Sequence, residues 1–305
     1  MLDQALSRLK ATGAIEYTGE FGAEITTFIP FAFWLKTQGL LSGRRVITHG
    51  GMRPYYYFLD DDEFHEKSDP RRWVPVEQRD WPTNSTYSAT KQAWHVVPEY
   101  RSRYRSQGRT FRRPVLFIQN KFCVEWGVGP LNFLSLVALR NLFSFAADRF
   151  DVVYSRPRPL PKGVGYTTDR NIHCDYPDVA LARQFSDVLI LEDLCASTGA
   201  SYNLTKLEIL AKTHVFVAVQ GGGAHLLACF GNSLLLLLHC EGPEYPHAYA
   251  SGPYKYLSTP PPVLLLARGH AQMLEGINVI GDLRMEAPEF RLGAALLPTF
   301  KALRF

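Results

Sequence analysis

Residues 215–242 decide the fold, and they read VFVAVQGGGAHLLACFGNSLLLLLHCEG. Two wholly apolar runs, 215–219 and 234–238, flank a glycine turn and an apolar segment at 224–230. Continuous aliphatic runs of this length are typical of parallel strands that are buried on both faces. Parallel neighbours need a crossover between them, and it is usually a helix. The stretch therefore predicts a strand–turn–helix–strand unit of an α/β sheet.

The same alternation extends over much of the chain. Apolar periodicity predicts further strands at 14–17, 45–48, 115–118, 152–154 and 187–191, and further helices at 25–38, 131–147 and 204–212. Pro30 is expected to kink or delay the first of these helices, and Asn203 to cap the last, with Lys206 and Glu208 on its outer face. We expect two α/β domains, over residues 1–160 and 161–305, with an irregular insertion at about 60–113 in the first.

Composition narrows the class of protein. The 305 residues carry 33 Lys and Arg against 29 Asp and Glu, and 46% of them are hydrophobic, which excludes a disordered or fibrous chain. A net charge of +4 does not indicate a nucleic-acid partner. The five cysteines form no Cys-x-x-Cys pair, so we expect neither a zinc site nor a disulfide framework. With no secretory leader or membrane-length apolar run in the sequence, a cytoplasmic location is expected.

The glycine turn is the first candidate binding site. Gln220, Gly221, Gly222 and Gly223 join a strand to a helix, where a small backbone can approach a ligand and helix N–H groups attract phosphate. The turn lacks both the Gly-x-Gly-x-x-Gly and the Gly-Lys-Ser/Thr pattern, and a simple tight turn is the alternative. His225 either donates to phosphate or packs inside the protein.

Two glutamates follow the next strand. Glu241 and Glu244 come after the run 234–238, at the edge where open parallel sheets bind their ligands. Either carboxylate can accept hydrogen bonds from ribose or sugar hydroxyls. The alternative is that both are solvated loop residues.

This layout resembles the GT-B class of nucleotide-sugar glycosyltransferases. In that class two Rossmann-like domains with parallel sheets face a cleft, and a Gly-rich loop and a nearby Glu of the C-terminal domain bind the donor. Residues 18–39, TGEFGAEITTFIPFAFWLKTQG, are similar to the amino-terminal loop and helix of many members, where an acid near the loop can serve as base. The resemblance implies an acceptor-binding domain over 1–160 and a donor-binding domain over 161–305. The insertion at 60–113 departs from the class, which has a regular β-α unit there.

Three acids are candidate catalytic residues. An inverting sugar transfer needs a base for the acceptor hydroxyl and groups that stabilise the departing diphosphate. Glu20 and Glu24 lie in the first loop, and Glu20 is the preferred base because Glu24 can equally stabilise the start of a helix. Glu125 is the alternative base.

Four further residues are candidates for contacts with acceptor or phosphate. Asn120 and Lys121 leave the strand 115–118, where Lys121 can offset negative charge. His49 and Arg53 follow the strand 45–48 and are weaker candidates for acceptor binding. The alternative for all four is an ordinary surface loop.

The expected partners are a nucleotide-sugar donor and a glycan or lipid-linked saccharide. The Asp-x-Asp pattern in residues 60–62 is better explained as a solvated acidic turn, so no metal or other cofactor is expected. The arginine run from Arg101 to Arg113 would contact an anionic membrane face if the acceptor is lipid-linked. Two rival functions remain: a nucleotide-sugar epimerase of similar fold, and a non-catalytic module that binds an anionic ligand or a glycan.

Overall fold

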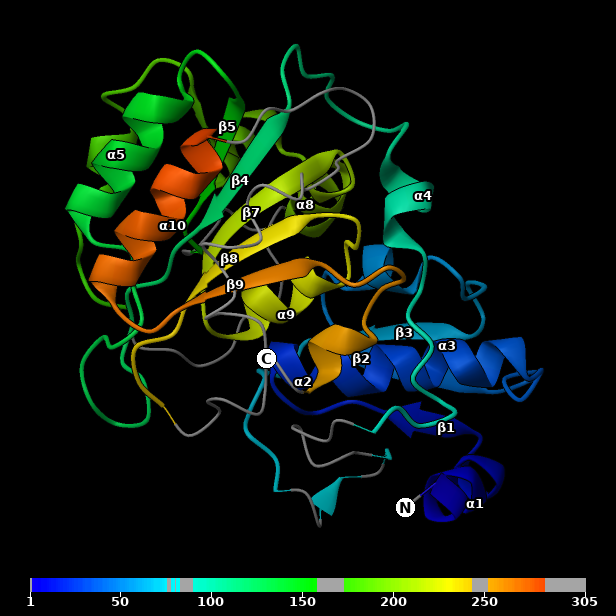
Figure 1. The fold of residues 1–305 in the computed structure, drawn as a ribbon. Helices are drawn as coiled ribbons and strands as arrows, with labels where there is room; N and C mark the ends of the chain where they lie inside the picture. The colour runs from blue at the N-terminus through cyan, green and yellow to red at the C-terminus, as the bar shows by residue number, and fades with distance from the viewer. Residues whose placement is uncertain are drawn as a thin grey trace.

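A computed structural model describes residues 2–75, 78–79, 81–82, 90–157, 173–242 and 252–282. The described chain is an α/β protein with two parallel sheets, one of three strands and one of six (Figure 1). The strands are β1 (Ala14–Glu16), β2 (Arg45–His49), β3 (Phe64–Lys67), β4 (Val115–Gln119), β5 (Asp151–Ser155), β6 (Val188–Ile190), β7 (Thr213–Val219), β8 (Leu234–Leu238) and β9 (Val263–Ala267). The α/β class with parallel sheets, predicted from the sequence, is confirmed.

Helices cover both sheets. The α-helices are α1 (Leu2–Thr12), α2 (Phe21–Ala23), α3 (Ile29–Thr37), α4 (Tyr100–Tyr104), α5 (Leu136–Ala146), α6 (Asp178–Ala182), α7 (Leu191–Thr198), α8 (Tyr202–Leu210), α9 (Gly222–Ala228) and α10 (His270–Asp282). The other helical turns are the π-helix η1 (Glu24–Phe28) and the 3₁₀ turns η2 (Arg53–Tyr56) and η4 (Pro253–Lys255).

The small sheet has the order β1-β2-β3, with both pairs of strands parallel. Pro30 does not delay the helix as predicted, because α2 and η1 run without a break into α3, which has the proline in its first turn. The preceding residues wind as η1, a wider helix. Strand β3 was not predicted: it lies inside the stretch expected to be irregular, since its half-exposed sequence lacks an apolar run.

The large sheet has the order β6-β5-β4-β7-β8-β9, and every neighbouring pair is parallel. Figure 1 shows α5 and α10 on one face and α8 and α9 on the other. Alternate strand residues serve the two faces: Leu116 and Ile118 belong to the core under α5 and α10, and Phe117 to the core under α7–α9. Both faces of the sheet are therefore buried from solvent, which explains why its strands are wholly apolar.

The two sheets share one core. The hydrophobic cluster under α7–α9 continues through α4 into α1, η1 and α3 of the small unit. The chain passes from the small sheet to the large one between Lys67 and Val115. The expected boundary at residue 160 therefore falls inside the large sheet, which contains β4 and β5 as well as β6–β9.

Four local predictions need correction. Asn203, expected to cap its helix, lies inside α8, which starts at Tyr202, and its Nδ2 donates to the carbonyl of Gly51 at 2.7 Å. The helix expected at 131–147 starts at Leu136, because Ser135 caps it by accepting a hydrogen bond from the N–H of Ala138 at 3.2 Å. The strand expected at 187–191 spans Val188–Ile190, and α7 begins at Leu191. Lys206, expected on the outer face of its helix, is buried at 3% exposure.

Candidate functional site

The order of strands in the large sheet places a switch point between β4 and β7. From β4 the chain moves outward to β5, and from β7 it moves the opposite way to β8. Loops that leave the carboxyl ends of β4 and β7 therefore diverge, and open α/β sheets bind their ligands in the crevice between such loops. Lys121 lies two residues after β4, and Gln220 directly follows β7. Both predicted residues thus lie at this edge.

Glu125 is the centre of a polar cluster at the switch point. Its Oε2 accepts from Lys121 Nζ at 2.6 Å, Gln220 Nε2 at 2.8 Å and Asn132 Nδ2 at 3.1 Å. The N–H groups of Leu131 and Asn132 donate to its Oε1 at 3.2 and 2.8 Å. We call Lys121, Glu125, Asn132 and Gln220 the edge cluster. Burial opposes ionisation of Glu125, but Lys121 and the amide donors outweigh it and hold its pKa below the usual value. A carboxylate so held is a poor general base.

Asn132 ties the loop after β4 to the loop after β8. Its Oδ1 accepts from the N–H of Cys240 at 2.7 Å, and its Nδ2 donates to the carbonyl of Glu241 at 2.9 Å. The side chain of Glu241 itself is exposed, on the same edge as the cluster. Glu244 lies outside the described residues. No local pattern in the sequence marks Asn132 as a link to the loop after β8, because Cys240 and Glu241 are about a hundred positions away.

The glycine turn is shaped mainly by contacts within the protein. A Cβ on Gly222 would lie 2.9 Å from the backbone nitrogen of Gly22, and one on Gly223 would collide with the side chain of Gln119. Gly221 differs, because its φ of +130° excludes most other residues and it faces Lys121 Nζ, which would be 3.5 Å from a Cβ there. Only Gly221 therefore combines the special backbone with a cationic neighbour, and close packing explains the other two.

The first loop of the chain meets this turn. The backbone of Gly22, in α2, contacts the backbone of Gly222 and the ring of His225. His225 is buried and meets the ring of Tyr254 edge-on, with centroids 5.7 Å apart. Its position indicates a packing role between α2 and Tyr254. The loop after β1 and the turn after β7, far apart in sequence, are thus neighbours.

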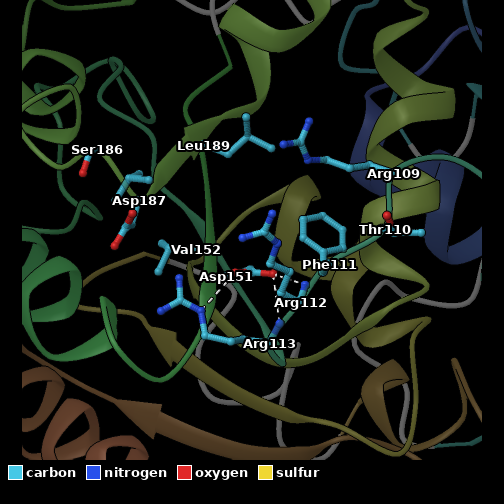
Figure 2. Close-up of a pocket in the computed structure, with 11 residues that line it drawn as sticks. Arg109, Thr110, Phe111, Arg112, Arg113, Asp151, Val152, Ser186, Asp187 and Leu189 are labelled. Carbon is cyan, nitrogen blue, oxygen red and sulfur yellow. Dashed lines mark hydrogen bonds and ion pairs between the residues drawn. The ribbon is translucent and has the colours of Figure 1, made fainter.

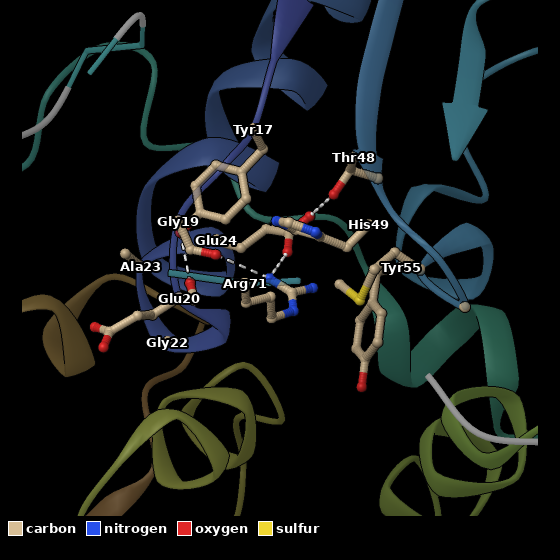
Figure 3. A network of polar contacts seen from close by, with 12 residues as sticks. Tyr17, Gly19, Glu20, Gly22, Ala23, Glu24, Thr48, His49, Tyr55 and Arg71 are labelled. Atoms are coloured by element: carbon tan, nitrogen blue, oxygen red, sulfur yellow. Dashed lines mark hydrogen bonds and ion pairs between the residues drawn. The ribbon is translucent and has the colours of Figure 1, made fainter. Parts of the chain in front are cut away.

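Glu24 is fully buried in a polar network with no exposed atom (Figure 3). Its carboxylate pairs with Arg71 Nη1 at 2.6 Å, both side chains being 0% exposed. The hydroxyl of Tyr56 donates to Oε1 at 2.7 Å, and Thr48 donates to the same oxygen. Burial raises the pKa of Tyr56 well above its ordinary value, and the Glu24 charge adds to this. These contacts give Glu24 a structural part that joins α2–η1, β2 and the segment after β3.

Glu20 is the exposed acid of the first loop. It precedes α2, and its backbone carbonyl accepts from the Tyr17 hydroxyl at 2.5 Å. Figure 3 shows its carboxylate directed away from the Glu24–Arg71 pair. Among the three acids predicted as bases, Glu20 is therefore the one whose carboxylate faces solvent.

A second buried chain of polar groups lies beneath the edge. Lys206 Nζ donates to Gln119 Oε1 at 2.9 Å, and Gln119 packs on Gly223. Burial lowers the pKa of Lys206 to about 8, against the opposing effect of Glu192. Burial also raises the pKa of Glu192, which accepts from Ser155 Oγ at 2.7 Å. The sequence could not reveal that Lys206 is buried near Glu192, since Lys206 has the spacing of an outer-face residue.

Asn120 and His49, predicted to contact acceptor or phosphate, are instead bonded to groups inside the protein. Asn120 is buried and bonded to the N–H of Leu134 at 2.8 Å and to Asp178 at 3.2 Å. His49 is buried with Nδ1 2.8 Å from the carbonyl of Asp69, and burial lowers its pKa, with a further contribution from nearby Arg71.

Arg53 and the acidic turn form surface ion pairs. Arg53 binds the carbonyls of Tyr56 and Leu59 at 3.0 Å and Asp61 at 2.8 Å. Asp60 pairs with Lys36 at 2.7 Å. Within the part of the chain that the structure describes, no group of three or more His, Cys, Asp or Glu side chains is placed to hold a metal ion.

The arginine run does not form one basic face. Arg101 is partly buried and donates to the carbonyls of Ala211, Thr213 and Phe230 at 2.9, 2.8 and 3.2 Å. Arg113 pairs with Asp151 at 3.1 Å. Contact of this run with a membrane surface stays a prediction, and no helix among the described residues is long and apolar enough to cross a bilayer.

The end of the run borders a pocket of about 620 Å³ at the amino-terminal ends of β4, β5 and β6 (Figure 2). Arg109 and Arg112 line it together with Phe111 and Leu189. This pocket lies at the sheet edge opposite the edge cluster, because parallel strands have all their amino ends on one side.

Comparison with known proteins gives no relative. No protein-family model matches the chain, and no curated protein or solved structure is significantly similar to it. Its function is therefore argued from the site alone.

Proposed function

We propose that this chain is a glycosyltransferase of the GT-B type, which moves a sugar from a nucleotide-sugar donor to a hydroxyl of a glycan or lipid-linked saccharide. The observation that carries the proposal is the meeting of two loops at the switch point of the large sheet. The loop after β1, which contains Glu20, packs through Gly22 on Gly222 in the turn after β7. An exposed acid and a cationic edge are thereby brought to the same region, as a transfer reaction requires.

The edge cluster supports binding of the donor diphosphate. Lys121 faces Gly221, whose left-handed backbone leaves no side chain between the turn and the ammonium group. Lys121 is 22% exposed, so its charge reaches solvent although it pairs with Glu125. In the proposed reaction Lys121 stabilises the departing diphosphate, and Glu125 fixes the position of Lys121. Because a protein cation does this, we propose that the transfer needs no divalent metal ion.

Glu20 is the proposed base. It takes the proton of the acceptor hydroxyl while that oxygen forms a bond to the anomeric carbon, and the bond from this carbon to the diphosphate breaks. The nucleoside diphosphate leaves with the electron pair, and the configuration inverts. Glu24 and Glu125 are unsuited to this part, since both carboxylates are buried in ion pairs. Glu241, exposed at the same edge, is proposed to accept hydrogen bonds from donor hydroxyls.

A non-catalytic binding module is the second candidate. The observation that favours it is that two of the three candidate acids are fully engaged in ion pairs. Such a module would bind a nucleotide sugar or a glycan without turning it over. An epimerase is distinguished from both by product formed in the absence of an acceptor.

The test measures release of nucleoside diphosphate from a panel of UDP, GDP, CMP and dTDP sugars with mixed oligosaccharide acceptors. CMP sugars release CMP and are read separately. Glu20→Gln is expected to lower kcat about 10²- to 10⁴-fold, the usual contribution of a general base. Glu275→Gln is the control, because Glu275 is exposed on α10, which lies on the other face of the sheet from α9. Unchanged turnover in Glu20→Gln would contradict the assigned base, and donor binding without release would support the binding module.

A further inference from the structure

Trp126 occupies a backbone conformation that a large side chain rarely adopts. Residues 125–128 form a tight hairpin in which Glu125 and Val128 exchange hydrogen bonds of 3.1 and 3.0 Å. The two central residues, Trp126 and Gly127, have φ of +48° and +82°. Positive φ at both positions defines a type I′ turn, for which Asn-Gly is the favoured pair. A Trp in the first position is strained, because its Cβ crowds the backbone carbonyl.

The surroundings hold this turn in place from two sides. Glu125, directly before Trp126, is fixed by the five donors of the edge cluster and its neighbours. On the other side the indole lies against Gly242, where a Cβ would come within 2.3 Å of its Cη2 atom. Gly242 has a φ of +130°, so both its backbone and the space beside it suit glycine. The loops after β4 and β8 are thus fitted around the indole.

Packing does not account for the strain. Trp126 is 50% exposed, so half of the large ring gains nothing from burial. Strained residues persist where their surroundings impose the conformation, and they gather at functional sites. Trp126 also lies at the carboxyl edge of the sheet, next to the edge cluster. A half-exposed aromatic ring in this place is accessible to a ligand that binds at the edge.

We propose that Trp126 is a stacking platform for a neutral sugar ring of the acceptor. This inference rests on the proposed transferase function and names the part of the site that receives the acceptor. The C–H face of a pyranose is apolar and packs on an aromatic face, while its hydroxyls remain at the rim and bond to polar groups. Glu241, the proposed contact of the donor hydroxyls, is one residue before Gly242, so a sugar stacked on Trp126 would lie beside the donor.

Trp126→Asn separates a binding role from a structural one. Asn suits the I′ turn, so the variant is expected to fold with a Tm equal to or above that of the wild type while it lacks the indole. If Trp126 serves only to pack on Gly242, the same variant loses stability instead. Trp126→Phe keeps an aromatic face, and Val263→Ala removes an exposed apolar side chain, 43% accessible, at the amino-terminal start of β9.

The experiment measures binding of labelled protein to an array of neutral oligosaccharides, with dissociation constants determined for the glycans that are captured. Trp126→Asn is expected to bind about tenfold more weakly, Trp126→Phe within about threefold of wild type, and Val263→Ala unchanged. Equal binding by Trp126→Asn and wild type, or capture of no glycan by wild type, overturns the platform. A thermal shift with nucleoside diphosphates, measured in parallel, tests the donor site separately. If a nucleotide raises Tm but no glycan binds, the platform alone is refuted. If no nucleotide raises Tm but glycan binding depends on Trp126, the transferase function is refuted and the sugar-stacking role of Trp126 stands.

Discussion

Removal of the Arg71 side chain should strongly destabilise the protein. Arg71 and Glu24 form an ion pair of 2.6 Å in which neither side chain is exposed (Figure 3). In Arg71→Met the carboxylate keeps its two hydroxyl donors, Tyr56 and Thr48, but loses the only opposite charge with which the described structure pairs it. An uncompensated buried charge costs about 3–5 kcal/mol.

The expected change in Tm follows from the size of the chain. Unfolding entropy is about 2.1 cal/mol/K per residue, which for 305 residues gives about 0.6 kcal/mol/K. A loss of about 3–5 kcal/mol therefore lowers Tm by about 5–8 °C. The measurement is thermal unfolding at pH 7, followed by circular dichroism.

Two further variants make this test specific. Arg183→Met breaks an exposed pair with Asp193, 2.9 Å long, and should change stability by less than about 1 kcal/mol. Glu24→Gln combined with Arg71→Met removes both charges while an amide oxygen still accepts from Tyr56 and Thr48, so at least half of the loss should be recovered. A Tm of Arg71→Met within about 1 °C of the wild type would refute the reasoning.

Three other substitutions test the edge of the large sheet. Gly222→Ala should lose about 1–3 kcal/mol, because its Cβ would lie 2.9 Å from the backbone of Gly22, whereas Gly129→Ala, with nothing within 4 Å, should be neutral in the same denaturant titration. Lys206 has a pKa of about 8 folded against 10.5 unfolded, so the unfolded state binds more protons between these pH values. The stability of the wild type relative to Lys206→Met should therefore rise by about 3 kcal/mol from pH 8 to 10.5, and a flat difference would exclude the lowered pKa. The folded pKa of Glu125 is lowered, so its contribution to stability is present above about pH 4.5 and is lost as pH falls through the folded value. Glu125→Gln should consequently lose less stability than the wild type on acidification below pH 4.5, as urea titrations at pH 3 and pH 6 would detect.

The sequence predicts the large sheet well, because buried parallel strands are recorded directly as apolar runs. The runs at 115–118, 215–219 and 234–238 all became central strands of the sheet. Strand β3 has no such signal, since two of its four residues are exposed and its pairing depends on β2. Local pattern thus finds the central strands, whereas among the edge strands β1 and β6 were predicted and β3 and β9 were missed.

The site was predictable as a region but not as a set of roles. Glu20 and Glu24 lie only four positions apart in the sequence, yet Glu24 is buried against Arg71 and Glu20 is exposed. Arg71, which lies after β3, sets that difference, and no local sequence pattern connects Arg71 to Glu24. Asn132 was missed for the same reason, because its bonds to the loop after β8 exist only in the folded chain.

The central claim is that the carboxyl edge of the large sheet binds a nucleotide, and a thermal-shift panel with UDP, GDP, CMP, dTDP and ADP tests it most directly. A ligand at 100 times its Kd stabilises the folded state by about 2.7 kcal/mol, which for this chain raises Tm by about 4 °C. We predict a shift with one kind of base, lost in Lys121→Met and retained in Arg112→Met, since Arg112 lines the pocket at the opposite edge. A shift with none of these nucleotides, or one that persists in Lys121→Met and disappears in Arg112→Met, would contradict the account.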